Sequence, residues 1–386
     1  MQGFTFNTVH QILCATGSRH QLGTTCQKLG ISRVLLVTDA GILRHNLHQD
    51  ALDSLHAAQI HVTLYSDVQA DPAEQVVLAA TQLAIAAGVD GVIGYGGGSS
   101  MDVAKLIALL ANPNQQQALP DIYGVDKITG QRLPLIQVPT TAGTGSEVTA
   151  VAIVTTGATS KMGIVSPRLL ADVAILDAEL TTGLPPLVTA ATGIDAMVHA
   201  IESFTSQHKK NPYSDLLAIA ALQTLDRHLQ TAIHDGSDLV AREQMLWGAM
   251  LAGQAFANAP VAAVHALAYP LGGHFHVSHG LSNALVLVAV LRFNLSNAAP
   301  LYAQLYRALA PQATGDDVTL AQHFIERLEQ HMIDSGLPRR LSEVGVTVQD
   351  LPQLAQDAMQ QTRLLINNPR EVTEADALAI YQSVLL

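Results

Sequence analysis

The sequence predicts a two-domain protein in which an α/β domain is followed by an all-α domain. Three observations support this fold class. The 386 residues exceed the ~100–200 residues of a usual single domain. In the first half, short apolar segments alternate with helical patterns, which is typical of parallel βαβ units. From about Pro185 the alternation stops, and long patterns rich in alanine and leucine indicate helices only.

We expect the α/β domain to cover residues 1–184 and the helical domain residues 185–386. The pair Pro185-Pro186 is a natural boundary, because proline both breaks helices and starts them. Strands of the first domain are expected at 33–39, 60–65, 91–95 and 135–138, with helices over 71–87 and 102–111. Helices of the second domain are expected over 187–205, 212–228, 238–258 and 319–335.

Composition and charge narrow the classes of function. Hydrophobic residues make up 48% of the chain and charged residues only 13%, which excludes a disordered chain and allows large cores. A net charge of −12 argues against a nucleic-acid partner. The first residues lack the pattern of a signal peptide, and apolar runs such as 284–291 fall short of a membrane span. We therefore expect a cytoplasmic protein with no membrane partner, whose Cys14 and Cys26 stay reduced.

A glycine-rich turn, GYGGGSSMD, occupies residues 94–102 between an expected strand and a helix starting near Ser100. Glycines let backbone amides approach an anion, and the helix N-terminus adds partial positive charge, so the turn predicts a pyrophosphate cradle. A tight turn without a ligand is the alternative. The spacing of Lys105 from the glycines excludes a P-loop.

Two further features favour a dinucleotide. Asp39 ends an earlier strand, where an acid can bind the adenosine ribose and repel a 2′-phosphate, which favours NAD over NADP. The alternative for Asp39 is a helix cap. The segment PTTAGTGSE, residues 139–147, places small polar side chains behind another strand, where they suit contact with phosphate and ribose oxygens. A plain Thr/Gly loop is its alternative.

A candidate metal site begins with Asp195 and His199, which share one face of a helix because they are four residues apart. His265 and His279 follow in apolar, glycine-rich surroundings. A buried carboxylate needs a partner, and a metal is one such partner. One carboxylate with three imidazoles suits Fe(II) or Zn(II) better than Ca(II) or Mg(II). The alternative is a hydrogen-bonded pair, since 16 histidines make chance spacings common.

Four segments, in this order, resemble the iron-containing (group III) alcohol dehydrogenase family: GGGSSMDVAK, PTTAGTGSEVT, the Asp195/His199 helix and HALAYPLGGHFHVSHG. The resemblance runs from Gly17 to the Asn368-Pro369-Arg370 stretch. It implies a dehydroquinate synthase-like fold with a dinucleotide-binding domain and an all-α metal-binding domain. It implies NAD(P)-linked interconversion of a small primary alcohol or diol and its aldehyde, in a homodimer or larger homo-oligomer.

The resemblance also assigns site residues. It implies metal ligands at Asp195, His199, His265 and His279, with Fe(II) or Zn(II) as the ion. Besides Asp39, it implies cofactor contacts at Gly97, Gly98, Ser99, Asp102, Thr140, Thr141, Thr144, Ser146, Lys161, Leu180 and Leu184.

This sequence departs from the family at two positions. Tyr269 stands where relatives often carry a histidine credited with proton transfer. Tyrosine is the weaker base at neutral pH, but its hydroxyl can pass a proton, so Tyr269 is the catalytic candidate. Pro270 makes regular helix at Tyr269 unexpected. Asp71 stands where relatives often have asparagine.

Alternatives on the same scaffold are a zinc polyol dehydrogenase and a lyase of the dehydroquinate synthase type. The cleft sequence holds few of the basic residues that a lyase for a phosphorylated substrate needs. A metal-dependent hydrolase that makes no use of nicotinamide and a non-catalytic NAD-binding protein are the remaining alternatives.

Overall fold

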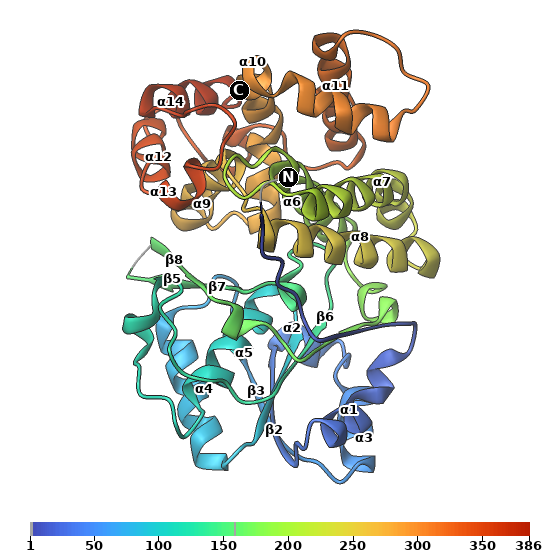
Figure 1. Ribbon diagram of the computed structural model, residues 1–386, viewed down its shortest axis with the longest axis vertical. Coiled ribbons are helices and arrows are strands. Elements are labelled where there is room, and N and C mark those ends of the chain that lie inside the picture. The colour runs from blue at the N-terminus through green and yellow to red at the C-terminus, as the bar shows by residue number, and fades with distance from the viewer. Residues whose placement is uncertain (1–2, 158–159) are drawn as a thin grey trace. The chain divides into compact units, whose positions relative to one another are not determined.

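The computed structural model describes residues 3–157 and 160–386, and its helices and strands are labelled in Figure 1. The chain forms two compact units. One unit is Asn7–Gly183. The other is Leu184–Leu386 together with the described residues before Asn7. The first unit holds all the strands, and the second is built from helices, so the predicted fold class is confirmed for the described residues.

A six-stranded parallel sheet organises the α/β unit. The strands lie in the order β1 (Gln11–Cys14), β9 (Val173–Leu176), β6 (Leu135–Pro139), β4 (Gly91–Gly96), β2 (Arg33–Asp39) and β3 (His61–Val68). The four strands expected from the sequence are β2, β3, β4 and β6. The two short strands β1 and β9 were not expected, and they pair with each other in register, Gln11 beside Val173.

Helices cover this sheet because its inner strands β2, β4, β6 and β9 are buried along most of their length and need cover on both faces. The helices of the unit are α1 (Leu22–Lys28), α2 (Ala40–Arg44), α3 (Gln49–Ala57), α4 (Glu74–Ala87) and α5 (Gly98–Leu110). Leu22 of α1 and Leu55 of α3 belong to one buried cluster with Leu36 of β2 and Ile93 of β4, which are register partners. Helix α5 packs against β4 and begins at Gly98, close to the start near Ser100 that the turn predicted, with Gly97 as its N-cap residue.

A second, three-stranded sheet completes the α/β unit. Its strands lie in the order β5 (Gly124–Val125), β8 (Ser160–Val165) and β7 (Val151–Thr156), with β7 and β8 antiparallel. Strand β7 packs against α5, and a short 3-10 turn, η3 (Ser146–Val148), precedes it. This sheet therefore fixes the start of β7 beside the helix that follows the glycine-rich turn.

The helical unit contains long helices that meet the expected ranges closely. Its helices are α6 (Pro186–Thr205), α7 (Pro212–His234), α8 (Leu239–Asn258), α9 (Ala263–Phe275), α10 (His279–Leu309), α11 (Asp317–Asp334), α12 (Leu351–Ala358), α13 (Thr362–Leu365) and α14 (Glu374–Ser383). Pro185 precedes α6, and Asn211 caps α7 by accepting a hydrogen bond from the Ser214 amide. Helix α6 packs against α7, α8 and α10, so it is the centre of this unit.

Helix α9 corrects the expectation drawn from Pro270. Regular helix was unexpected at Tyr269, yet α9 continues through both residues to Phe275. Proline in a helix interior disturbs the hydrogen bonds of the preceding turn. In that turn the hydroxyl of Tyr381, from α14, donates to the carbonyl oxygen of Leu267 at 2.6 Å. Packing against α10 and α12 and this external donor keep the helix in place.

Helix α10 was not expected from the sequence, in which only the short apolar run 284–291 had been noted. Over the described residues it is the one helix whose length and composition would let it cross a membrane, with a mean hydropathy of 1.5 over the tested window. Half of that window is buried inside the protein. Helix α10 packs against α6, α9 and α11, and a buried core helix passes the same test. We therefore assign α10 to the core of the helical unit.

Candidate metal centre and cofactor-binding turn

Helix α6 presents the first two predicted metal ligands. Asp195 and His199 lie one turn apart on it, and both are buried, at 1% and 3% exposure. The helix is buried along its last three turns because it lies between α7, α8 and α10. A carboxylate in such a place must find charge or hydrogen-bond partners, because an isolated buried charge is costly.

The other two predicted ligands come from the first turns of α9 and α10. His265 is the third residue of α9 and is buried, and His279 is the first residue of α10 and is about one-third exposed. Gly280 lets α10 approach α6 closely, since a Cβ there would lie 2.4 Å from the carbonyl oxygen of Ala191. That close packing brings His279 to the face of α6 that carries Asp195.

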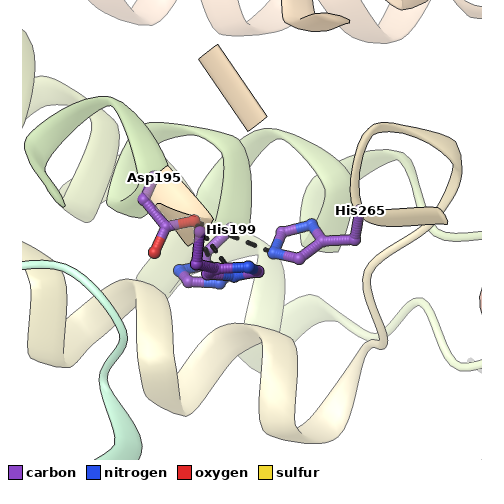
Figure 2. Close-up of side chains that lie close together, drawn as sticks. Asp195, His199 and His265 are labelled. Atoms are coloured by element: carbon purple, nitrogen blue, oxygen red, sulfur yellow. Dashed lines mark ion pairs between the residues drawn. The ribbon is translucent and has the colours of Figure 1, made fainter. Parts of the chain in front are cut away.

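The four side chains converge. The Nε2 atoms of His199, His265 and His279 lie 3.8, 3.9 and 3.5 Å from Oδ1 of Asp195. One donor atom from each of the four residues lies within 4.8 Å of all the others. Figure 2 shows the ring of His265 directed toward the Asp195 carboxylate, with dashed lines for the ion pairs. The sequence prediction thus named four residues that the fold brings to one point.

Asn283 shows that the acceptor atoms point inward. It lies one turn after His279 and is fully buried. Its amide nitrogen donates to Asp195 Oδ1 at 2.6 Å and lies 3.3 Å from the Nε2 atoms of both His265 and His279. An amide nitrogen only donates and has two hydrogens, so with one on Asp195 it has one left for the lone pair of either imidazole. Oδ1 of Asp195 and the Nε2 atoms converge on one point, which is the arrangement that a cation requires.

Electrostatics and stacking hold the cluster. Burial alone would raise the pKa of Asp195. The nearby imidazoles and the Asn283 amide have the larger, opposite effect, so the pKa of Asp195 lies below its ordinary value. The ring of Phe256, from α8, stacks on His199 with centroids 4.3 Å apart. Stacked rings restrict the orientation of the imidazole, which keeps its Nε2 directed at Asp195.

Glu202 is a residue that the sequence analysis did not select. It is buried one turn after His199 on α6, and its Oε2 lies 2.7 Å from Nδ1 of His265. Glu202 lies seven residues after Asp195, which puts both on the same helix face, and this spacing could have identified Glu202 from the sequence. Asn283 was missed as well, although its spacing of four from His279 was visible.

Tyr269 lies beside the cluster. It is one turn after His265 on α9, half-buried, and its ring centroid is 6.0 Å from that of His279. Its ring is therefore carried by the same helix as one candidate ligand and lies beside another. His274, also on α9, bonds Asp357 instead, with its Nε2 2.6 Å from Oδ2.

In the α/β unit, the glycine-rich turn borders a hollow of about 370 Å³. This volume is within the range of small-ligand sites. The hollow is lined by the end of β2, helix α2, the end of β3 with the residues after it, and Gly97 with the start of α5: Asp39, Ala40, Gly41, Arg44, Val68, Gln69, Ala70, Gly97, Gly98, Ser99 and Ser100. It therefore gathers four of the predicted cofactor residues: Asp39, Gly97, Gly98 and Ser99.

The topology of the sheet explains this position. After β2 the chain runs to β3 on one side, and then returns to β4 on the other side of β2. In open parallel sheets, ligands bind beyond the carboxyl ends of the strands where the order reverses in this way. Asp39 ends β2 and Gly97 follows β4, so both lie at this reversal. Asp39 also caps α2, because its Oδ1 accepts hydrogen bonds from the amides of Gly41 and Ile42 at 2.7 and 3.2 Å.

The threonine-rich segment after β6 lies against the turn. The Thr140 amide donates to the Gly96 carbonyl at 3.0 Å. A Cβ at Gly98 would lie 2.8 Å from Cγ2 of Thr144, so only glycine permits this approach. Thr141 is the nearest side chain to the corresponding point of Gly97, at 3.8 Å. Thr140, Thr141 and Thr144 thus form one wall beside the glycines.

Lys105 fastens this wall to α5, a role that the sequence analysis did not foresee. Its side chain is fully buried, and its Nζ donates to Ser146 Oγ at 2.8 Å, Thr149 Oγ1 at 3.1 Å and the Val151 carbonyl at 2.7 Å. Burial lowers the pKa of Lys105, and the nearby carboxylate of Asp102 opposes that effect. One lysine therefore connects α5 with η3 and β7.

Asp102 and Ser146, both predicted to contact the cofactor, belong to the same connection. Ser146 Oγ donates to Asp102 Oδ1 at 2.6 Å, and the Ile153 amide donates to Asp102 Oδ2 at 3.0 Å. The neighbouring Glu147 is fully buried, and burial raises its pKa to about 7 although its backbone amide and Lys105 act in the opposite direction. The polar atoms of Asp102 and Ser146 thus bind the protein itself.

Three further predicted cofactor residues lie elsewhere. Lys161, on β8, bonds Asp71 with Nζ 2.6 Å from Oδ1. Leu180, in the 3-10 turn η5 (Ala178–Thr181), belongs to the buried cluster under the sheet. Leu184 begins the long segment of the helical unit, Leu184–Leu386, and its carbonyl oxygen accepts a hydrogen bond from Arg242 at 3.5 Å. The structure does not bring these three to the hollow.

Family models match both parts of the chain. The model of iron-containing alcohol dehydrogenase matches residues 10–178, and that of the C-terminal part of the Fe-containing alcohol dehydrogenase family matches residues 189–385. The chain belongs to the iron-containing alcohol dehydrogenase family. It is accordingly an oxidoreductase of the alcohol dehydrogenase class, and the lyase and polyol dehydrogenase alternatives are not favoured.

Named relatives in this family resemble the whole chain. The chain is 40% identical to long-chain-alcohol dehydrogenase 1 of Geobacillus thermodenitrificans, over 95% of this chain and 93% of that protein. It is 34% identical to 1,3-propanediol dehydrogenase of Klebsiella pneumoniae, over 94% and 93%. A crystal structure of 1,3-propanediol oxidoreductase matches at a TM-score of 0.95, with 33% identity and all of both chains covered.

Proposed function

We propose that this iron-containing alcohol dehydrogenase interconverts small primary alcohols or diols and their aldehydes with NAD and a metal held by Asp195, His199, His265 and His279. The observation that carries the proposal is the convergence of these four side chains within 4.8 Å. Relatives named for long-chain alcohols, 1,3-propanediol and methanol support an alcohol substrate. The methanol dehydrogenase is named as NAD-dependent, which supports NAD.

The donor set fits a divalent transition metal. One carboxylate and three imidazoles suit Fe(II) and Zn(II), and the family name supports iron. Oδ1 of Asp195 and the Nε2 atoms of His265 and His279 already lie around the Asn283 amide nitrogen, which is the convergent arrangement that a cation needs. A metal held there supplies a Lewis acid that polarises an alcohol or aldehyde oxygen. Asp195 contributes the negative charge and the imidazoles the remaining donors.

The cofactor is assigned to the hollow in the α/β unit. The amides of Gly97, Gly98 and Ser99, at the N-terminus of α5, suit a pyrophosphate. Asp39 uses one carboxylate oxygen to cap α2, and as part of the lining it supplies charge that disfavours a 2′-phosphate. In this proposal residues 1–184 bind the cofactor, with the threonine wall contributing, and residues 185–386 hold the metal and the substrate.

Tyr269 is proposed to pass the proton that alcohol oxidation releases. Its ring lies next to His279, so its hydroxyl is carried close to the candidate metal. The hydroxyl can accept a proton on one lone pair while donating its own to water, so it relays a proton without long-lived ionisation. We further propose that the enzyme works in the cytoplasm as a homodimer or larger homo-oligomer.

The metal assignment is tested with His265→Ala. The wild-type protein, stripped with a chelator and reloaded with Fe(II) or Zn(II), is expected to bind one metal per chain and to form NADH from short alcohols and diols. His265→Ala is expected to lose most of both properties, because one of four donors is removed from a closed cluster. The control is His323→Ala, an exposed histidine of α11. Full metal content and turnover in His265→Ala would remove it from the ligand set.

Cofactor choice is tested with Asp39→Ser. Serine can still cap α2 but carries no charge. Arg44 lines the same hollow and remains as a cation, so the variant is expected to gain at least tenfold in kcat/KM with NADP relative to NAD. Exposed Asp53→Asn, on α3, is the control that changes charge by the same amount. An unchanged NADP/NAD ratio in Asp39→Ser would contradict the role given to Asp39.

A further inference from the structure

We propose that Glu202 is a positioning residue for the metal: it fixes the tautomer and the aim of His265, and thereby tightens metal binding. This inference rests on the proposed function, since it concerns the same metal. Glu202 is not one of the four converging residues. It lies behind His265, and its effect on the metal is transmitted through that imidazole.

The two oxygens of Glu202 bind two consecutive residues of α9. Oε2 lies 2.7 Å from Nδ1 of His265, and Oε1 accepts a hydrogen bond from the Val264 amide at 2.7 Å. Ala262, which precedes α9, has no side-chain oxygen to cap the helix. The Glu202 carboxylate therefore caps the first turn of α9 from the neighbouring helix α6, and the same contact fixes where His265 stands.

The contacts on both sides of the His265 ring agree on one tautomer. A carboxylate only accepts hydrogen bonds, so Nδ1 must carry the proton and donate it to Glu202. On the far side, Nε2 faces the amide nitrogen of Asn283 at 3.3 Å, and that nitrogen is a donor. The orientation of the Asn283 amide is itself fixed by Asp195, which only accepts. Nε2 therefore keeps its lone pair free and directed into the cluster.

Burial makes this pair strong. Glu202 and His265 are 3% and 2% exposed, so water does not compete for either group. A carboxylate behind a metal-binding imidazole raises its basicity and holds its ring, and removing such a partner typically lowers metal affinity by about 10–100-fold. The cluster also contains Asp195, but the Glu202 carboxylate is the one that faces the outer nitrogen of His265.

The test is Glu202→Gln, which keeps the shape but reverses one hydrogen bond. Its amide oxygen can still cap α9 through the Val264 amide, and its NH₂ group then faces Nδ1 of His265. That donor favours the tautomer with the proton on Nε2, which blocks the lone pair. We expect Zn²⁺ affinity, measured by chelator competition, to fall by about 10–100-fold, and the rise in melting temperature on adding Zn²⁺ to shrink.

A matched control is Asp226→Asn. Asp226 of α7 is a partly buried carboxylate that also bonds a histidine, with Oδ1 2.9 Å from Nε2 of His331, and it pairs with Arg327 as well, but it lies outside the metal cluster. This variant is expected to lose stability without metal while keeping the Zn²⁺ affinity of the wild type. A loss of stability alone therefore cannot imitate the effect predicted for Glu202→Gln.

A second measurement is made on the wild-type protein itself. In ¹⁵N NMR of histidine-labelled wild-type protein with Zn²⁺, the His265 signals, identified by their loss in His265→Ala, should show a protonated Nδ1 and a metal-bound Nε2. Wild-type Zn²⁺ affinity in Glu202→Gln, or coordination through Nδ1 in the wild type, would overturn the inference while leaving the proposed function intact. Failure of the wild type to bind either Zn²⁺ or Fe(II) at this cluster would overturn both.

Discussion

Glu147→Gln should stabilise the protein at neutral and higher pH but barely change it in acid. Glu147 is fully buried, and its pKa is raised by burial from 4.5 to about 7. Between these two values the unfolded chain has released the proton that the folded chain still holds. Stability contributed by the protonated group is therefore present below about 4.5 and is lost as pH rises toward 7. Glutamine mimics the protonated form at every pH.

The size of the effect follows from the shift. One pKa unit corresponds to about 1.4 kcal/mol, and most of the linked loss falls between about pH 5 and pH 8. Over that interval the free energy of unfolding of the wild type should fall by about 2.5 kcal/mol relative to Glu147→Gln. Urea denaturation of both proteins at the two pH values measures this difference. Glu326→Gln, an exposed glutamate of α11, is the control.

A difference between Glu147→Gln and the wild type that stays constant from pH 5 to pH 8 would refute the reasoning. It would mean that Lys105 offsets the burial of Glu147 in the folded protein, so that the carboxylate is ionised throughout. A difference that grows in the opposite direction, with the wild type gaining on the variant as pH rises, would show that the ion pair outweighs desolvation.

Two further substitutions test the packing around the sites. Lys105→Met should destabilise the α/β unit by about 2–4 kcal/mol, because the Val151 carbonyl loses its buried donor. The variant should also bind NAD more weakly. Denaturation and NAD titration measure both effects, with the exposed Lys28→Met as the control. Gly280→Ala should cost about 1–3 kcal/mol, because its methyl would meet the Ala191 carbonyl, and should reduce bound metal by displacing His279. Thermal unfolding and metal content that match the wild type would contradict the second prediction.

The sequence predicted well those features that depend on a pattern within a single strand or helix. The alternation of apolar segments located β2, β3, β4 and β6, and helical spacing placed Asp195 and His199 on one face of α6. It missed β1 and β9, whose four residues each are too few to show a pattern and whose pairing spans most of the unit. It also expected Pro270 to interrupt regular helix, where packing and an external donor keep α9 continuous.

For the sites too, spacing along the sequence predicted contacts within one helix but not contacts between helices that are far apart in the sequence. That His265 and His279 join Asp195 depends on how α9 and α10 pack on α6, which no spacing within the sequence contains. Glu202 looked like an ordinary helical glutamate until the structure put His265 against it. Conversely, Asp102 and Ser146 were selected for their place in a motif, whereas their side chains are engaged with the protein by contacts that only tertiary structure reveals.

The pairing of β1 with β9 has a consequence for how the chain folds during synthesis. Gln11 meets Val173, so β1, the first of the described strands to be synthesised, must wait for almost the entire α/β unit before its partner exists. At about 5–20 residues per second this interval is on the order of ten seconds or more. During that time β1 has no neighbour and β6 keeps an open edge, since β9 lies between them in the finished sheet. The sheet is therefore completed last by β9, which pairs with β1 from the opposite end of the unit's sequence. A nascent chain stalled before Val173 should be markedly more prone to aggregate than one stalled after Leu176.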